Sequence, residues 1–231
     1  MASEELKKQA GEFAVNFIQS GMIVGLGEGS TAIWAIRKIA LDIQNGTLQN
    51  ILGIPCSKNV ERIAQALGIP LTTLDAHPVI DLTIDGADEV DPQFNLIKGG
   101  GGALLREKIV AQATRREVIV VDENKLSKRL GTVWAVPIEV LPFGWSSQRR
   151  FLESLGGAVN VRQRDNADYL TDQGNLILDT RFGPIADPTK LAAQLSERAG
   201  IVEHGLFIGL TRDLIVASVE GVKHLKIEND E

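Results

Sequence analysis

The sequence predicts an α/β protein, with helices flanking an open, mostly parallel sheet and with a small α+β subdomain. Two observations predict this fold. Up to about Gly131, apolar runs of strand length alternate with segments of helical periodicity, the βαβα order of a parallel sheet. These runs are apolar almost throughout, as strands are when helices cover both faces of the sheet. The large sheet is therefore expected to be Rossmann-like.

The first half of the chain supplies the elements of this sheet. It opens with an amphipathic helix whose apolar stripe runs from Leu6 to Ile18. Ser30 or Thr31 is placed to cap the second helix. Strands are expected at 22–27, 51–57, 71–74, 79–85 and 117–122, and further helices at 31–43, 60–67 and 102–115.

The pattern changes after Gly131. A strand-like run at 133–142 leads into a helix at 146–155, and two runs of strand character follow at 157–164 and 169–180, with a glycine-containing turn at 172–175. Asp187 and Pro188 open a last helix, with proline at its first position. The final runs, 206–211 and 213–220, are expected to be strands that return to the first domain. We predict an α/β catalytic domain of 1–131 plus 205–231, and a small α+β subdomain of 132–204.

Composition excludes several classes of function. The net charge of −6 argues against a protein that binds nucleic acid or an anionic membrane, because both need a basic face. No apolar run has membrane-spanning length. A single cysteine, Cys56, excludes an intrachain disulfide and suits a reducing compartment. We expect a soluble, cytoplasmic protein.

Three turns rich in glycine and carboxylates each follow a strand-like run. They are GLGEGST (25–31), DGADEVD (85–91) and KGGGGALLREK (98–108). In an open parallel sheet, ligands bind beyond the carboxyl ends of the strands. These turns would bring a backbone anion cradle, two aspartates, a lysine and a helical glutamate to one rim. Such groups suit proton transfer on a small anionic substrate.

The first turn leaves two interpretations open. It does not match a dinucleotide fingerprint, because Ser30 takes the third glycine position and no carboxylate ends the next strand. It does not match a Walker loop either, since no lysine follows the glycines. The turn either holds one phosphate at a helix N-terminus or is a tight turn with a Ser or Thr cap.

The acidic turn and the glycine run have alternatives as well. DGADEVD could be a solvated loop or a metal site, although its spacing does not match an EF-hand. Asp85 directly follows an apolar run and is expected at the rim with Asp88, whereas Glu89 and Asp91 are expected to be structural or solvent-facing. Taken alone, Glu107 could be a surface residue that stabilises the helix dipole. The alternative for Lys125 is a solvated side chain.

Taken together, GxGST, DGADE, KGGGGAxxREK and D-x-x-K resemble ribose-5-phosphate isomerase of type A, and so does the later PIEVLPF. The resemblance extends over nearly the whole chain. It implies the interconversion of D-ribose 5-phosphate and D-ribulose 5-phosphate without a metal or organic cofactor. It also implies a homodimer or homotetramer, in the cytoplasm or, for a photosynthetic eukaryote, in the plastid stroma after removal of a transit peptide.

The resemblance also implies roles for individual residues. Glu107 would be the base that moves a proton between C1 and C2, and Asp85, Asp88 and Lys98 would bind the sugar and handle hydroxyl protons. The substrate-binding set would be Glu28, Gly29, Ser30, Thr31, Asp85, Gly86, Ala87, Asp88, Lys98, Gly99, Gly100, Gly101 and Lys125. Glu28 departs from the family, whose turn usually has Thr there. Its carboxylate would repel a phosphate unless it points outward or pairs with a cation such as Lys7 or Lys8.

Two other classes of protein remain to be distinguished. A sugar-phosphate-sensing domain of a transcription regulator would require a DNA-binding module, and the chain opens with one helix and no helix-turn-helix. A relative of the acyl-CoA transferases would form a covalent adduct on Glu107 with a CoA thioester, which the isomerase interpretation forbids.

Overall fold

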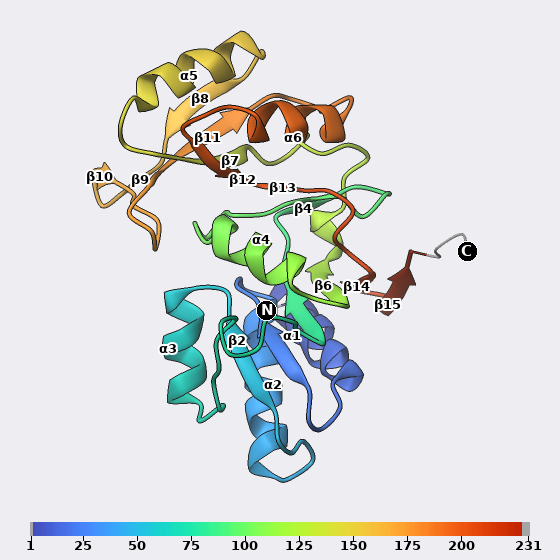
Figure 1. The fold of residues 1–231 in the computed structure, drawn as a ribbon. Helices are drawn as coiled ribbons and strands as arrows, with labels where there is room; N and C mark the ends of the chain where they lie inside the picture. Colours follow the sequence, from blue (N-terminus) through green and yellow to red (C-terminus); the bar gives the residue numbers. More distant parts are fainter. Residues whose placement is uncertain (1, 228–231) are drawn as a thin grey trace. The chain divides into compact units, whose positions relative to one another are not determined.

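The computed structural model describes residues 2–227, which form two compact units (Figure 1). Within the described residues, the first unit runs to Ala87 and continues with Arg106–Lys125 and with the chain from Leu210 onward. The second unit is Asp88–Leu105 with Leu126–Gly209. Each unit contains its own cluster of buried apolar side chains.

A six-stranded sheet with the order β15-β14-β6-β3-β1-β2 forms the centre of the first unit. The five strands from β2 to β14 are parallel, and β15 pairs antiparallel with β14 at the edge. Because helices bury the sheet, β3 and β6 are buried along their whole length. The strands are β1 (Ile23–Leu26), β2 (Leu52–Pro55), β3 (Leu82–Asp85), β6 (Glu117–Asp122), β14 (Asp213–Ser218) and β15 (Gly221–Lys226).

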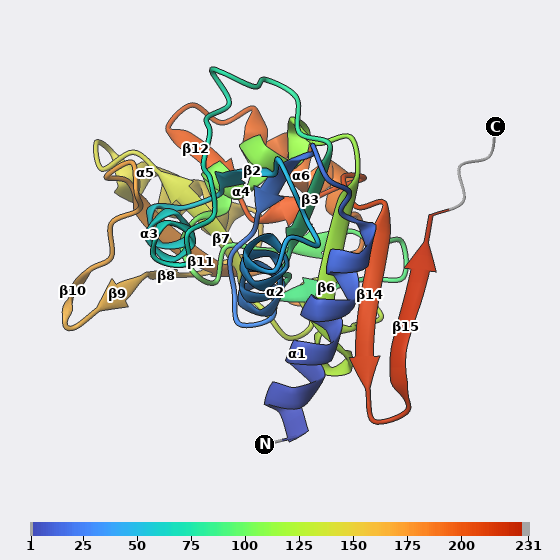
Figure 2. The same ribbon diagram turned by 90° about the horizontal axis from the view of Figure 1, so that it is seen from below.

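The helices of this unit pack on the sheet through their apolar faces. Figure 2 shows α1 lying along β6 and β14, and α1 also packs against α2. The Ser57 hydroxyl caps α3 by accepting a hydrogen bond from the Val60 amide (3.0 Å). The helices are α1 (Ala2–Ala14), α2 (Ala32–Gln44), α3 (Lys58–Ala66) and α4 (Leu104–Gln112), with 3₁₀ turns η1 (Val15–Phe17) and η2 (Glu123–Lys125).

The second unit is built on antiparallel pairing. Its larger sheet has four strands in the order β12-β7-β11-β8, its smaller sheet has the order β13-β5-β4, and β9 and β10 form a hairpin. The strands are β4 (Glu89–Val90), β5 (Leu96–Ile97), β7 (Val136–Val140), β8 (Ala158–Val161), β9 (Gln163–Arg164), β10 (Ala167–Asp168), β11 (Leu176–Arg181), β12 (Ile201–His204) and β13 (Leu206–Phe207). The helices are α5 (Trp145–Ser154) and α6 (Pro188–Ser196).

The predicted fold class is confirmed, while several local expectations are corrected. The run at 71–74 forms a single bridge, Gly53 with Leu71, instead of a strand. Thr31 stands at the start of α2 without a side-chain cap hydrogen bond. In contrast, Asp187 caps α6 as expected, since its Oδ1 accepts from the Lys190 amide (2.9 Å).

The end of the chain also differs from the expectation. The run at 206–211 supplies β13, which pairs with β5 in the second unit, so only the run that gives β14 joins the large sheet. The strand β15 was not expected from the sequence. Residues 88–105, placed by the sequence in the catalytic domain, belong to the second compact unit. As independent folding domains, the ranges 1–131 plus 205–231 and 132–204 stay a prediction.

Candidate active site

The Asp85 carboxylate is built into the glycine turn that follows β1. Its Oδ1 accepts hydrogen bonds from the amides of Glu28 (2.9 Å) and Gly86 (2.7 Å), and the residue is 1% exposed. The Gly27 amide donates to the carbonyl of Ile84 (3.0 Å). A Cβ atom on Gly27 would lie 2.3 Å from this Oδ1, so only glycine allows the approach. These contacts join the carboxyl ends of β1 and β3.

The rest of the turn leads into α2. Gly29 and Ser30 are exposed, whereas Thr31 is buried. Amide groups at a helix N-terminus favour an anion, so exposed residues before α2 suit a phosphate. The Glu28 carboxylate contacts the neighbouring helix, where it accepts a hydrogen bond from Nδ2 of Asn59 (3.3 Å). This contact directs the Glu28 side chain toward α3.

Glu107 and Lys125 lie on two further elements of the first unit. Glu107 is the fourth residue of α4 and is 5% exposed, which contradicts the surface interpretation of this glutamate. Its neighbour Lys108 is buried as well. Lys125 ends the 3₁₀ turn η2 after β6, where Oδ1 of Asp122 accepts from the Asn124 amide (3.1 Å). Asp122 thereby shapes the turn that carries Lys125.

Asp88 and the glycine loop meet in the second unit. The Asp88 amide donates to the carbonyl of Ile97 (2.9 Å), and its Oδ2 accepts from the Gly100 amide (2.7 Å). The short antiparallel pair β4–β5 therefore brings the acidic turn to the start of the glycines. Lys98 follows β5 and is buried, and its Nζ lies 5.7 Å from the centre of the Phe207 ring.

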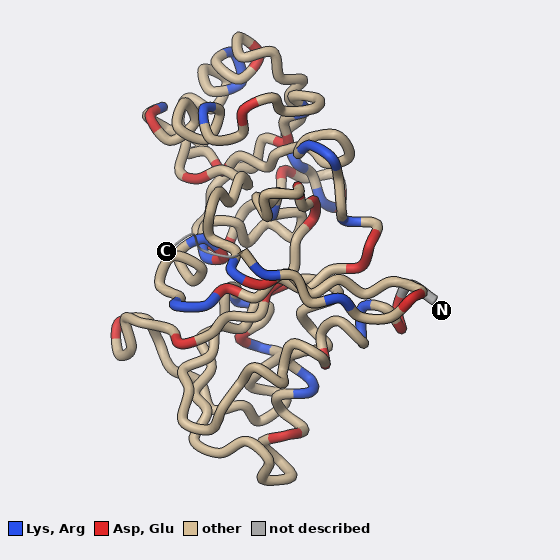
Figure 3. Tube along the Cα trace, turned by 90° about the vertical axis from the view of Figure 1, so that its right-hand side faces the viewer, with Lys and Arg blue, Asp and Glu red and all other residues tan. Residues whose placement is uncertain are grey.

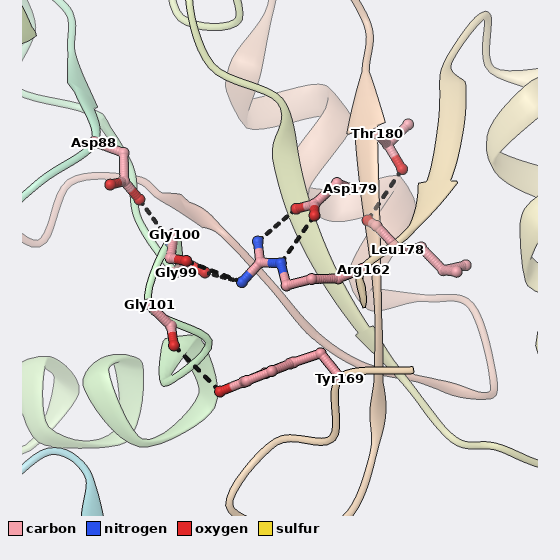
Figure 4. Close-up of polar contacts among 9 residues, drawn as sticks. All are labelled: Asp88, Gly99, Gly100, Gly101, Arg162, Tyr169, Leu178, Asp179 and Thr180. Atoms are coloured by element: carbon pink, nitrogen blue, oxygen red, sulfur yellow. Dashed lines mark hydrogen bonds and ion pairs between the residues drawn. The ribbon is translucent and has the colours of Figure 1, made fainter. Parts of the chain in front are cut away.

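Sequence reasoning missed three residues of the second unit, of which two contact the same glycines and the third pairs with one of those two (Figure 4). The Arg162 guanidinium donates to the carbonyls of Gly99 (2.8 Å) and Gly100 (3.1 Å), and the Tyr169 hydroxyl donates to that of Gly101 (3.2 Å). Asp179 pairs with Arg162. The sequence offers a weak signal for the pair, an Arg and an Asp on neighbouring strand-like runs, but nothing that indicates the glycines as their target.

The other acidic residues of DGADEVD have structural roles. Of the two expected alternatives for Glu89, structural or solvent-facing, its burial supports the structural one. Its two oxygens accept hydrogen bonds from four consecutive amides, at Gly131, Thr132, Val133 and Trp134 (3.0–3.2 Å). Asp91 closes its own loop by accepting from the amides of Gln93 and Asn95 (both 2.9 Å). Of the four carboxylates of DGADEVD, Asp85 and Asp88 are therefore the two that contact the glycine turns.

Within residues 2–227, no group of three or more His, Cys, Asp or Glu side chains is arranged to hold a metal ion. Across the same residues, every helix is too short or too polar to span a membrane.

The comparisons with known proteins address identity. The family model described as ribose 5-phosphate isomerase A (phosphoriboisomerase A) matches residues 52–221, more than half of the chain. The chain belongs to the ribose-5-phosphate isomerase A family. This membership confirms the resemblance found in the motifs, and with it the prediction of an aldose–ketose isomerase.

Similar members of this family come from distant organisms. The chain is 58% identical over 225 residues to ribose-5-phosphate isomerase A of Chloroflexus aurantiacus, covering 97% of this chain and 94% of the relative. It is 55% identical to the protein of that name from Desulfatibacillum aliphaticivorans, with 97% and 98% covered. A probable ribose-5-phosphate isomerase 2 of Arabidopsis thaliana is 44% identical, with 96% and 87% covered.

Solved structures of the family have the same fold. A D-ribose-5-phosphate isomerase in complex with phospho-erythronic acid matches with a TM-score of 0.95 and 38% identity, covering 98% of this chain and all of that chain. Ribose 5-phosphate isomerase from Plasmodium falciparum matches with a TM-score of 0.94 and 39% identity, with 96% and 98% covered.

Proposed function

We propose that this protein interconverts D-ribose 5-phosphate and D-ribulose 5-phosphate by proton transfer through an enediolate. The main structural support for this proposal is the burial of Glu107 in the first turns of α4, directly after the glycine loop. A buried carboxylate near a substrate is a suitable general base, which contributes about 10²–10⁴-fold to a rate. The relatives named ribose-5-phosphate isomerase A support the choice of substrate.

In the proposed reaction, the Glu107 carboxylate removes the C2 proton of the open-chain aldose. The electron pair of that C–H bond forms the C1–C2 double bond, and the carbonyl electrons move to O1. Glu107 then returns the proton to C1, the hydroxyl proton of O2 is transferred to O1, and the carbonyl re-forms at C2. Negative charge develops on O1 and O2, and donors aimed at such oxygens matter by about 10²–10³-fold each.

We assign the remaining residues by the chemistry they offer. Lys98 and Lys125 supply positive charge, and Asp85 and Asp88 accept and return hydroxyl protons. The substrate phosphate binds at the Gly29–Thr31 segment before α2, in which Gly29 and Ser30 are exposed and where backbone amides and hydroxyls favour an anion. Remote phosphate binding supplies energy that orients the reacting carbons.

The direct test follows ribulose 5-phosphate formation from ribose 5-phosphate, with ribose and other aldose phosphates as controls. In D₂O, the proposed mechanism places solvent deuterium at C1 of the ketose, whereas a hydride shift from C2 to C1 would introduce none. Glu107→Gln keeps the shape of the side chain but removes the base. It should lower kcat at least about 10²-fold while the protein stays folded.

Glu139→Gln is a matched control, because Glu139 is equally buried but lies on β7 of the second unit. It should keep kcat within about threefold of wild type if only the glutamate on α4 is the base. Retention of more than a tenth of wild-type turnover by Glu107→Gln would remove Glu107 from the proposed role.

We further propose that the enzyme needs no metal or organic cofactor, so activity should survive exhaustive chelation with EDTA.

A homodimer or homotetramer in the cytoplasm, or in the stroma of a plastid, is proposed from the resemblance, and light scattering at assay concentration measures the oligomer. Figure 3 shows basic residues interspersed with acidic ones along the chain, which supports a small-molecule substrate over nucleic acid or a membrane.

A further inference from the structure

Arg162 connects the larger sheet of the second unit to the glycine loop. Its Nε donates to Oδ2 of Asp179 (2.8 Å) and its Nη2 donates to Oδ1, so the pair is bidentate. The remaining terminal nitrogen, Nη1, donates to the carbonyls of both Gly99 and Gly100. In Figure 4 the guanidinium lies between the Asp179 carboxylate and these carbonyls.

The Arg162–Asp179 pair is largely shielded from solvent, which helps to keep the guanidinium and the carboxylate in the bidentate arrangement. The side chain of Arg162 is 15% exposed and that of Asp179 is 27% exposed. Asp179 lies on β11, and Arg162 directly follows β8, the neighbouring strand in the sheet. Because both residues are held by one antiparallel ladder, Asp179 fixes the plane of the guanidinium and thus the direction of Nη1.

The loop that Arg162 contacts has little conformational preference of its own. Gly99–Gly102 is a run of four glycines, the residue with the largest backbone freedom. Gly99 and Gly102 have φ angles of +96° and +93°, in the left-handed region. The loop closes one turn of its own, because the Gly102 amide donates to the Gly99 carbonyl (3.0 Å). Hydrogen bonds from side chains outside the loop to its carbonyls add to this turn in fixing which way the peptide groups face.

Peptide planarity converts the carbonyl contacts into amide directions. In a trans peptide, the C=O of one residue and the N–H of the next point in opposite directions. Since Arg162 holds the Gly99 carbonyl, the Gly100 amide points away from Arg162, and it donates to Asp88 (2.7 Å). The Gly100 carbonyl is held in the same way, so the amide of exposed Gly101 also points away from the arginine.

Tyr169 extends this arrangement by one peptide. It follows the β9–β10 hairpin, and its hydroxyl binds the Gly101 carbonyl. Its ring fills the space beside Gly102, where a Cβ atom would lie 2.2 Å from the hydroxyl oxygen. Three successive carbonyls of the loop are thus held by two side chains from one segment of the second unit.

We propose that Arg162, fixed by Asp179 and assisted by Tyr169, is a positioning residue for the isomerisation. It orients the glycine peptides so that the Asp88 carboxylate is held in place and the Gly101 amide faces the bound sugar as a donor to a developing oxyanion. This inference rests on the proposed function. Arg162 does not touch the reacting atoms in this proposal, and it acts through the loop.

The test compares three arginine-to-lysine variants, which all keep the positive charge. Arg162→Lys loses the bidentate fork and the contact with the glycines. Arg164→Lys changes an exposed arginine two residues away, whose guanidinium lies 4.6 Å from the centre of the Tyr169 ring. Arg116→Lys changes an arginine of the first unit that also forms a bidentate pair, with Asp213. The assay measures kcat, KM and the thermal unfolding midpoint for each.

Arg162→Lys should lower kcat/KM at least about tenfold, mostly through kcat, because misplaced donors and carboxylates act in the transition state. Arg164→Lys should stay within about threefold of wild type, and Arg116→Lys should lose stability with little loss of kcat.

A pair of inhibitors separates positioning from a general loss of structure. Phospho-erythronic acid carries a planar carboxylate that imitates the two oxygens of an enediolate, whereas erythritol 4-phosphate has a neutral hydroxymethyl group there. Arg162→Lys should raise the Ki of the acid by about the factor by which kcat/KM falls, and should change the Ki of the alcohol less than about threefold. Equal weakening of both inhibitors would overturn the proposal.

Two milder variants keep the test decisive if Arg162→Lys folds poorly. Asp179→Asn leaves Arg162 present but loosens it, and Tyr169→Phe removes only the hydroxyl that binds Gly101. Both should repeat the selective loss for the acid to a smaller extent. If wild type is active and all three variants keep wild-type kcat, the inference fails alone. If wild type does not interconvert the two sugars, the proposed function fails as well.

Discussion

The two units each contain a bidentate Arg–Asp pair, and the pairs serve different ends. In the first unit, Arg116 donates to Asp213 through Nε (2.7 Å) and Nη2 (2.9 Å), and its guanidinium stacks 4.5 Å from the centre of the Phe17 ring. His224 on β15 adds a contact of 2.6 Å to the same carboxylate. In the second unit, Arg162 keeps one nitrogen for the glycine carbonyls.

Position in the sheet explains the difference. Asp213 opens β14 and Arg116 directly precedes β6, so this pair lies at the amino ends of the parallel strands. The turn with Asp85 lies at the carboxyl ends, the rim where ligands bind in such sheets. The first pair therefore joins strands and the helical segment before β1, while the second shapes a loop that the family's motif includes. The comparison shows that the bidentate geometry of an Arg–Asp pair does not by itself define the role of the pair. The role depends on what else the pair contacts, which is Phe17 and His224 in the first unit and the glycine carbonyls in the second.

The largest expected effect on stability is that of Asp213→Asn. This change removes the charge that Arg116 and His224 share, and hydrogen bonds to charged groups contribute about 1.5–3 kcal/mol, less where Arg116 is partly exposed. The thermal unfolding midpoint should fall by about 2–4 °C per kcal/mol of lost stability. Urea unfolding at pH 7 measures the fall in the free energy of unfolding, and kcat per folded molecule should remain unchanged. If Asp213→Asn lowered kcat more than Asp179→Asn does, the proposed difference in role between the two Arg–Asp pairs would be wrong.

The pH dependence of this loss has a definite sign. Burial opposes ionisation of Asp213, but the hydrogen bonds from Arg116 and His224 outweigh it and hold the pKa of Asp213 below its usual value. A lowered folded pKa gives stability that is present above the unfolded pKa, about 3.9. It is lost as the pH falls through the folded pKa. The gap between wild type and Asp213→Asn should therefore close in strong acid, and an unchanged gap at pH 3 would contradict this assignment.

Glu139→Gln should show the opposite dependence, with a smaller effect. Burial raises the pKa of Glu139, although hydrogen bonds from Asn175 and Thr171 (both 2.8 Å) lower it in part. A raised folded pKa gives stability that is complete below the unfolded pKa and is lost as the pH rises through the folded pKa. The variant should gain stability relative to wild type between pH 4 and pH 8, by about 1 kcal/mol per unit of pKa shift. Thermal unfolding across this range measures the gain, and equal midpoint differences at both ends would refute it.

The smallest expected effect is that of Glu28→Thr, which restores the residue usual in the family. The Glu28 carboxylate accepts a hydrogen bond from Asn59 at the start of α3, so we expect it to contribute little to phosphate binding. KM for ribose 5-phosphate should stay unchanged or fall by no more than about tenfold, the effect of one partly screened charge. Steady-state kinetics at low and high salt check this. A large rise in KM would mean that Glu28 binds the sugar or organises the turn.

The sequence alone determined the local features of this protein. Periodicity placed β1, β2, β3 and β6, and turn chemistry placed the Asp187 cap of α6. The sequence could also predict that Asp85 lies near the turn after β1, because the strands that carry both are parallel neighbours and end at one rim. These features depend on residues close in sequence, or on the simple rule that parallel strands end together.

Only the tertiary structure decided contacts between distant segments. Glu89 was expected to be structural or exposed, but the chain folds four amides of residues 131–134 onto its carboxylate. Arg162 reaches glycines more than sixty residues earlier, and β13 leaves the large sheet to pair with β5. The physical reason is the same in each case. Strand order and register fix which side chains meet, and a residue in a short run carries no periodic signal that identifies its distant partner.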